Sequence, residues 1–265
     1  MHGAWAICKR ELHSYFVSPV AYAVMAIFWI AEGAFFISIM NYWAVQGRQA
    51  DIRAQEFGSA GNLLNVPAQI GGSFLDITAL VLLFIVPIVA MGLLAEEKKR
   101  RTMELLLTSP VSNAGILLGK FLGGFGFLFV VLMPTFLYQY LPTAFGAGDP
   151  AVWISGYLGL LMMAAAMLAG TLFVSSITSN QLVAAFGGYG LLLVFWFIDA
   201  PANLLMNPIW QDVVRWLSLY NHFGDARVGV ISLRDVNYFF CFITVFLYLT
   251  HMALESIRWR GVRSR

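Results

Sequence analysis

Long uncharged runs alternate with short charged segments along this chain. No Asp, Glu, Lys or Arg occurs from Ile77 to Ala95, from Phe121 to Gly148 or from Pro150 to Ile198. Because a helix needs about 20 apolar residues to cross a bilayer, the last run is long enough for two crossings, with residues 178–181 as the turn between them. The runs are apolar on every side, whereas the strands of a membrane barrel alternate apolar and polar residues, so the pattern predicts helices.

We therefore predict an all-α, polytopic membrane protein with six transmembrane helices in a single domain, residues 1–265. The expected spans are Pro19–Met40, Ile77–Leu94, Ile116–Tyr138, Ile154–Ile177, Leu182–Ile198 and Val236–Leu254. The composition agrees, because 60% of the residues are hydrophobic and 11% are charged, whereas soluble domains carry about 25% charged residues. Cys8 and Cys241 fall before the first span and inside the last, so no disulfide is expected.

The distribution of cations predicts which side of the membrane each connection faces. Lys and Arg number two in the N-terminal segment, five between the second span and the start of the third, and four after the last span, against five in the connections of the other side. Cytoplasmic loops carry the excess of Lys and Arg in membrane proteins. We therefore expect both termini in the cytoplasm and the protein in the bacterial cytoplasmic (inner) membrane.

Residues 1–18 are expected to form an amphipathic helix at the cytoplasmic surface of the membrane. Charged residues lie between apolar side chains that recur every three or four positions, at Trp5, Cys8, Leu12, Tyr15 and Phe16. This spacing places the apolar side chains on one face of a helix. Ser18 and Pro19 are then expected to turn the chain into the first span.

Two longer connections are predicted on the outer side. Residues 42–76 are polar and contain glycine, so we expect a loop with some helix. Within residues 199–235, Pro208 starts a segment whose apolar residues share one helical face, while Asp212 and Arg215 share the other. This amphipathic helix either lies at the outer membrane surface or enters the bundle as part of a re-entrant hairpin.

Residues 95–113 form the most charged connection of the chain. An ordinary solvated cytoplasmic loop would also carry such charge, with its four consecutive cations Lys98–Arg101. However, a short helix over residues 102–108 would expose three successive leucines, which is unfavourable unless a partner covers them. After Pro110, Ser112 or Asn113 can cap the start of the next helix.

Several motifs resemble those of the type-2 ABC transporter permeases, in particular the gliding-motility (GldF-like) branch, with the NosY-like permeases of copper-site maturation nearby. The most specific motif is Met103–Val111, which reads MELLLTSPV, and further matches are Ala95–Lys98, Lys9–Leu12 and Phe173–Gln181. The resemblance runs along nearly the whole chain. One departure is Arg101, where the family commonly has glycine, so the local turn there is expected to differ.

The resemblance implies that the chain is the transmembrane permease subunit of an ABC transporter. Such a subunit couples ATP hydrolysis by a separate ATPase subunit to substrate export or to conformational work. The resemblance also implies a homodimer or heterodimer of six-span subunits above two ATPase subunits, with a coupling helix within residues 95–113 and an outer gate within residues 199–235. The residues expected to contact the ATPase are Glu96, Glu97, Arg100, Arg101, Thr102, Glu104, Leu105, Leu106, Leu107 and Thr108, with Lys9 and Arg10.

Two other classes of function are compared with a transporter. The first is a mechanical transmission subunit, of the gliding-motility or metal-centre-assembly type, which acts on a periplasmic auxiliary subunit without bulk transport. The second is an intramembrane enzyme, which would need paired acid–base or metal groups at one depth, and the sequence does not show such pairs. Contacts with membrane lipid are expected, and no nucleic-acid partner is expected.

The chain is not expected to hydrolyse ATP itself. A phosphate-binding loop needs the spacing GxxxxGK[ST], and Gly115–Phe121 has one residue too few between its glycines and ends in phenylalanine. The glycines at positions 115, 119 and 123 instead predict a small-residue stripe for close helix packing. ATP and magnesium are therefore expected in the partner ATPase, and no cofactor, catalytic residue or metal site is expected in this chain.

Glu32 is the carboxylate that lies deepest within a predicted span. An ionisable residue at such depth points to a functional role by default, so a place in a transport path or gate is one interpretation. Two others remain open: Glu32 reaches the outer headgroups, or it is protonated and hydrogen-bonded to a neighbouring helix. Trp210 and Trp216, in the predicted amphipathic helix, are further candidates for the gate.

Overall fold

The computed structural model of the protein describes residues 2–57, 66–100, 102, 111–144, 150–204 and 207–263, and every regular element among them is helical. The elements are α1 (His2–Val17), α2 (Pro19–Phe57), α3 (Val66–Lys99), α5 (Asn113–Leu132), η1 (Met133–Thr135), α6 (Phe136–Ala144), α7 (Pro150–Ile177), α8 (Gln181–Phe197), η2 (Ala202–Leu204), α9 (Pro208–Leu217), α10 (Gly224–Arg227) and α11 (Leu233–Arg263). The all-α prediction is confirmed for the part of the chain described.

Five of the described helical segments are long and apolar enough to cross a membrane. They are Pro19–Ala50, Gln69–Lys99, Asn113–Leu141, Val152–Ile177 and Leu233–Ser256. The fifth predicted span corresponds to α8, which is apolar but has only 17 residues. Asn180 caps α8 by accepting a hydrogen bond from the backbone N–H of Leu182, as expected for the predicted turn.

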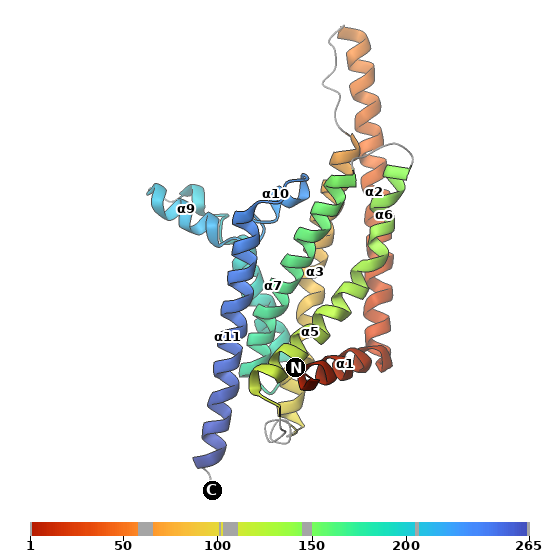
Figure 1. The fold of residues 1–265 in the computed structure, drawn as a ribbon. Coiled ribbons are helices and arrows are strands. Elements are labelled where there is room, and N and C mark those ends of the chain that lie inside the picture. Colours follow the sequence, from red (N-terminus) through yellow and green to blue (C-terminus); the bar gives the residue numbers. More distant parts are fainter. Residues whose placement is uncertain are drawn as a thin grey trace.

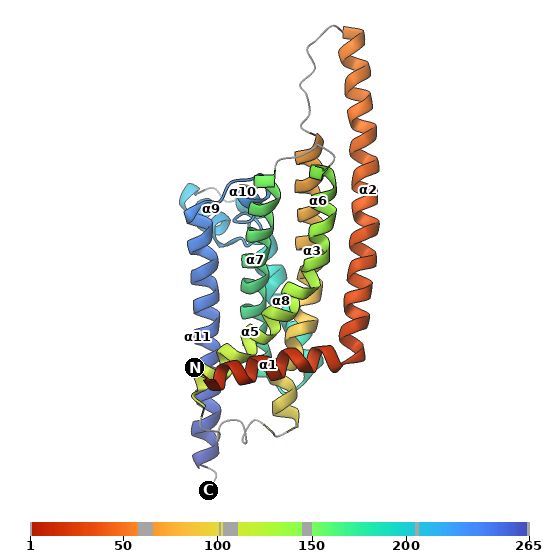
Figure 2. The same cartoon turned by 45° about the vertical axis from the view of Figure 1, so that its right-hand side comes forward.

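The long helices run side by side, and α1 lies across one end of the bundle (Figures 1 and 2). The chain turns from α1 into α2 at Ser18, where the sequence predicted the turn. Both ends of the chain lie toward this end of the bundle, which we call the α1 end, while α9 and α10 lie at the opposite end, the α9 end (Figure 1). The two amphipathic helices predicted from the sequence, α1 and α9, therefore lie at opposite ends of the bundle.

The helices α3 and α7 form the centre of the bundle. Fully buried residues of α3 include Leu82 and Leu83, and those of α7 include Met163 and Met167. The run Ala164–Ala166 of α7 is also buried, and such small residues let neighbouring helices approach closely. These two methionines are therefore packing residues of the core.

The helix α2 is much longer than a membrane span. Its 39 residues extend over about 58 Å, roughly twice the thickness of a bilayer's hydrocarbon core. Figure 2 shows that α2 reaches well beyond the other helices at the α9 end. The loop with some helix predicted for residues 42–76 is more helical than expected, because its described part is helical up to Phe57 and again from Val66. Alanines and glutamines favour helix there, and no proline follows Pro19 before Pro67.

The third predicted span is interrupted rather than continuous. α5 ends at Leu132, a short 3₁₀ turn contains Pro134, and α6 then begins at Phe136. Proline lacks a backbone N–H and clashes with the preceding turn of an α-helix, which accounts for the change. The start of α5 follows the prediction, because the Ser112 side chain accepts a hydrogen bond from the N–H of Gly115.

The glycine stripe of α5 receives α1. A Cβ atom at Gly119 would lie 2.6 Å from the carbonyl oxygen of Ala4 and 2.8 Å from Cβ of Ile7, and one at Gly123 would lie 2.7 Å from Cβ of Glu11. The predicted close packing is therefore confirmed, and the partner helix is α1. The buried face of α1 differs slightly from the prediction, because Trp5 is exposed.

Because the space at Gly119 is closed by backbone, we expect Gly119→Ala to lower the free energy of unfolding by about 1–3 kcal/mol. The thermal unfolding midpoint of the purified protein in detergent measures the change. Gly190→Ala is the matched control, because a Cβ atom at Gly190 of α8 would meet no atom within 4 Å; it should be neutral or slightly stabilising, since alanine is the better helix former. Equal midpoints for the two variants would show that α1 does not pack on the stripe as described.

Candidate functional site

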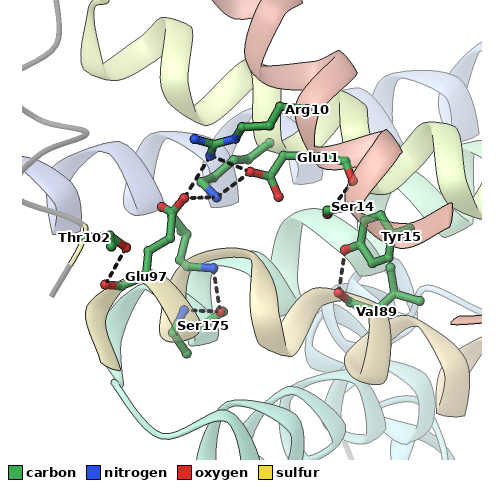
Figure 3. Close-up of polar contacts among 11 residues, drawn as sticks. Arg10, Glu11, Ser14, Tyr15, Val89, Glu97, Thr102 and Ser175 are labelled. Carbon is green, nitrogen blue, oxygen red and sulfur yellow. Dashed lines mark hydrogen bonds and ion pairs between the residues drawn. The ribbon is translucent and has the colours of Figure 1, made fainter. Parts of the chain in front are cut away.

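Three elements meet at the α1 end, and we call this region the foot: α1, residues 91–100 of α3 and residues 113–124 of α5. Figure 3 shows the polar contacts that join them. Tyr15 of α1 stacks on Phe127 of α5 with ring centroids 4.5 Å apart, and its hydroxyl donates a hydrogen bond of 2.8 Å to the carbonyl oxygen of Val89 in α3. Burial raises the pKa of Tyr15, so the hydroxyl stays a donor. α1 is thereby attached to both spans.

Four charged side chains form the centre of the foot. Lys120 of α5 lies between two carboxylates, with Nζ 3.1 Å from Oε1 of Glu11 in α1 and 2.9 Å from Oε1 of Glu97 in α3. Arg10 contacts the same two oxygens at 2.8 Å and 3.0 Å. Two cations and two anions thus alternate, and every element of the foot contributes to the cluster (Figure 3).

Burial makes this charge cluster energetically important. The side chain of Lys120 is 1% exposed, whereas that of Arg10 is 55% exposed. A buried ammonium is tolerated only when it is paired, and removal of one partner of a buried pair typically costs about 3–5 kcal/mol. The hydrogen bond with Glu11 raises the pKa of Arg10, so this cation remains charged. One oxygen of Glu97, Oε2, is buried without a hydrogen-bond partner among the described residues.

The end of α7 holds the end of α3 from the other side. The hydroxyl of Ser175 accepts hydrogen bonds from the backbone N–H groups of Leu94 and Ala95 (Figure 3). It also donates one to the carbonyl oxygen of Met91. In a regular α-helix, the N–H of residue 95 would pair with the carbonyl of residue 91, so Ser175 shares these backbone groups. A side chain that enters the hydrogen-bond ladder in this way is a known cause of helix bending. Lys98 also donates to the carbonyl oxygen of Ser176.

The residues predicted to contact an ATPase divide into three groups. Arg10 and Glu97 belong to the charge cluster, and Lys9 is exposed on α1. Glu96 pairs with Arg100 at 2.7 Å, and Thr102 donates from its N–H to the carbonyl oxygen of Glu97 at 3.0 Å. The remaining members lie outside the described residues: Arg101, Glu104, Leu105, Leu106, Leu107 and Thr108.

Sequence reasoning missed Lys120 and Glu11 as members of the site. Lys120 counted only as a cytoplasmic cation, and Glu11 only as part of a motif. Their separation of 109 positions gives no sign of contact. The available signal was the combination of a glycine stripe on α5 with a cation beside Gly119 and an amphipathic N-terminal helix containing one carboxylate.

Glu32 is buried against α3 rather than open to the headgroups, since it has no exposed surface. The hydroxyl oxygen of Thr78 lies 2.9 Å from Oε2 of Glu32 and 2.9 Å from the carbonyl oxygen of Phe74. Thr78 has one hydroxyl proton, and the carbonyl can only accept, so a protonated Glu32 that donates to Thr78 from Oε2 pairs Oε2, the hydroxyl and the carbonyl. Oε1 of Glu32 is buried and has no hydrogen-bond partner among the described residues. The alternative of a protonated carboxyl bonded to a neighbouring helix fits this geometry; a role in a transport path stays a prediction.

The α9 end carries the predicted amphipathic helix. α9 begins at Pro208, with Asn207 as its N-cap, and none of its residues is buried. Its apolar face is exposed, including both gate candidates, Trp210 at 60% and Trp216 at 46%. The helix prediction is therefore confirmed, while the described structure places α9 beside the bundle and not within it (Figure 1).

Charged and polar contacts tie the segment around α9 to two long helices. Asp76 of α3 forms an ion pair with Arg227 of α10 and accepts a hydrogen bond of 3.2 Å from the Tyr220 hydroxyl. His222 contacts Asp235 of α11 through Nδ1 at 2.6 Å and the carbonyl oxygen of Trp216 through Nε2 at 2.8 Å. We call residues 199–235 the gate segment from here on. Within the described residues, no group of three or more His, Cys, Asp or Glu side chains is arranged to hold a metal ion.

Lys120→Met keeps the apolar stem of the side chain and removes its charge, so Glu11 and Glu97 lose a buried partner. We expect the free energy of unfolding to fall by up to about 3–5 kcal/mol, measured as a lower thermal unfolding midpoint in detergent. Lys99→Met is the matched control, because Lys99 is exposed in the neighbouring helix end. If Lys120 and Glu97 contact each other, the double variant Lys120→Met/Glu97→Gln should lose less stability than the sum of the losses of the two single variants. A Lys120→Met midpoint equal to that of the control would contradict a buried pair.

The comparisons with known proteins agree with these features. The ABC transporter permease protein NatB of Bacillus subtilis (strain 168) is 33% identical over 103 residues, and the match covers 35% of this chain and 27% of that protein's length. A model of the ABC-2 family of transporter proteins matches residues 5–254, which include most of α1 and α11, the other long helices and the gate segment. This chain therefore belongs to the ABC-2 family of transporter proteins.

Proposed function

We propose that this ABC permease chain works as a subunit that converts ATP-driven motion of a separate ATPase into movement of the gate segment. The observation that carries the proposal is the foot, in which one buried lysine joins α1, α3 and α5. The cation-rich connection between α3 and α5 leaves the foot at Arg100 and returns to it at Ser112. A force applied to this connection therefore acts on all three elements together.

The helix α3 supplies the path from the foot to the gate segment. Its Glu97 belongs to the charge cluster, and its Asp76 pairs with Arg227 and Tyr220 of the gate segment. A single helix thus contacts both regions, so a rigid-body shift of α3 moves both. The Ser175 hydroxyl, which shares backbone groups near residue 95, provides a place where the end of α3 can bend relative to its span.

In the proposed assembly, two six-span subunits lie above two ATPase subunits in the bacterial inner membrane. α8 adds the remaining span to the other five, between α7 and α11, because its 17 residues extend over about 26 Å, close to the thickness of the hydrocarbon core. The α1 end faces the cytoplasm, in line with its excess of Lys and Arg. ATP and magnesium are bound by the ATPase, and this chain is not itself an enzyme. Whether the second permease subunit is identical or different, the exposed apolar faces of α2 and α8 offer it a contact.

A mechanical role on a periplasmic partner is the second candidate, and one specific observation favours it. Beyond the membrane-sized part of α2, the helix continues to Phe57 and projects from the α9 end (Figure 2). Such an extension would reach an auxiliary subunit outside the membrane, as expected for a GldF-like or metal-centre-assembly permease. A transport assay and a pull-down of a periplasmic partner would separate export from mechanical transmission.

The contact with the ATPase is tested by Leu106→Asp and Glu104→Ala. Each variant is co-expressed with the ABC ATPase encoded nearest to the gene of this chain, and co-purification and ATP hydrolysis are measured. We expect both to fall, because in this proposal the leucines and the carboxylate of this segment dock in the ATPase. Ile52→Asp is the control, since Ile52 is 54% exposed in the part of α2 that projects from the α9 end, outside the foot and the gate segment. Unchanged assembly and ATPase activity in the Leu106 and Glu104 variants would remove the coupling role of this segment.

A further inference from the structure

A cavity of about 270 Å³ lies at the side of the foot, between α1, the start of α2 and the end of α3. One part of its wall is apolar, with Val20, Val24, Ile88 and Phe127. Val20 and Ile88 are also exposed on the outside of the bundle, so the apolar wall continues onto the surface that faces lipid. The cavity is therefore accessible to a molecule that is partly embedded in the membrane.

The other part of the cavity wall is polar and anionic. Glu11 and Glu96 both line it, together with Ser14, Ser18 and Gln181, and none of the described lining residues is Lys, Arg or His. Each carboxylate contacts its cations through Oε1: Glu11 with Arg10 and Lys120, Glu96 with Arg100. Among the described residues, Oε2 of either carboxylate has no hydrogen-bond donor, although the Glu11 side chain is only 13% exposed.

This lining selects the chemistry of a ligand. A primary ammonium group has three N–H donors and no acceptor. The wall offers it acceptors: Oε2 of Glu11 and Glu96, the hydroxyls of Ser14 and Ser18, and the amide oxygen of Gln181. An alkyl chain attached to it would lie along the apolar wall. An anionic headgroup would face two carboxylates without a cation to pair with, and a bare metal ion would need more oxygen ligands than the half-apolar wall provides.

We propose that this cavity is a binding site for the primary ammonium headgroup of a membrane-embedded amphiphile, held by Glu11 and Glu96. Glu11 is also a member of the charge cluster, and Glu96 pairs with Arg100 at the start of the cation-rich connection. A bound ammonium at Oε2 would share the carboxylate of Glu11 with Lys120 and Arg10, which contact Oε1, so occupancy is sensed at the foot. This sensing role rests on the proposed function, whereas the binding itself does not.

Binding is measured on the purified chain, without an ATPase, by isothermal titration calorimetry in dodecyl maltoside, a detergent that brings no ammonium group. The probe is hexylammonium, and hexanol and hexanesulfonate are the uncharged and anionic counterparts with the same chain. We expect saturable binding of hexylammonium alone. Glu96→Gln should weaken it at least about tenfold, which corresponds to about 1.4 kcal/mol, because one of the two carboxylates loses its charge.

Two further variants make the result specific to the cavity. Glu255→Gln is the charge-matched control. The side chain of Glu255 is 42% exposed and that of Glu96 is 38% exposed, and each pairs with a residue four positions away. The Glu255→Gln variant should bind hexylammonium as the wild type does. Gly92→Leu keeps both carboxylates but adds volume to the wall, where a Cβ atom would be in ordinary contact with Glu96 and Gln181 at 3.4 Å and 3.9 Å. We expect it to abolish binding without lowering the unfolding midpoint.

Each outcome of these measurements either supports or overturns the proposed binding site. Equal binding by the wild type and Glu96→Gln, or binding of hexanesulfonate as well as hexylammonium, would overturn the proposal even if the ATPase contact is confirmed. Displacement of hexylammonium by dihexanoylphosphatidylethanolamine, but not by dihexanoylphosphatidylglycerol, would support the site and identify the occupant as an amine lipid. Specific binding without such displacement would support it with a non-lipid amphiphilic amine as the occupant.

Discussion

The arrangement of the α1 end depends on the burial of one positive charge. Lys120 has almost no exposed surface, so its ammonium group must find partners within the protein, and the two nearest carboxylates belong to helices that are far apart in sequence, α1 and α3. The glycine stripe of α5 makes this possible, because only residues without a side chain let α1 approach closely enough for Glu11 to reach Lys120. Close packing and charge pairing thus require each other in the foot.

The helix α3 links the foot to the opposite end of the molecule. α3 packs at the centre of the bundle and carries a paired carboxylate near each end, Asp76 toward the gate segment and Glu97 in the foot. A displacement of the foot therefore cannot leave the gate segment unaffected unless α3 bends. Ser175 shares backbone groups with the last turns of α3, where the proposed bending would take place. In the proposed function, α3 couples the two ends of the molecule and α7 modulates this coupling.

Much of the fold followed from the sequence, because hydrophobic runs and capping residues are local signals. The turn within residues 178–181, the start of α5 at Ser112 or Asn113 and the amphipathic helix from Pro208 were all predicted, and the caps observed are Asn180 and Ser112. The extension of α2 was not, since polar composition does not distinguish an exposed helix from a loop. The charge cluster was missed for a different reason: the contact of Lys120 with Glu11 depends on how α1 packs, which no local pattern encodes.

The central claim is that the foot moves as one unit and that α3 passes this movement to Tyr220 and Arg227 of the gate segment. Electron–electron resonance distances measured in the complex with the ATPase test it, with spin labels at His13→Cys and Lys99→Cys or at Lys99→Cys and Leu204→Cys, in a Cys8→Ala/Cys241→Ser background. All three labelled positions are exposed. On ATP binding, the account predicts an unchanged distance between positions 13 and 99. It predicts a changed distance between positions 99 and 204, because α3 moves with the foot while residue 204 follows the end of α8. A changed first distance with an unchanged second one would contradict it.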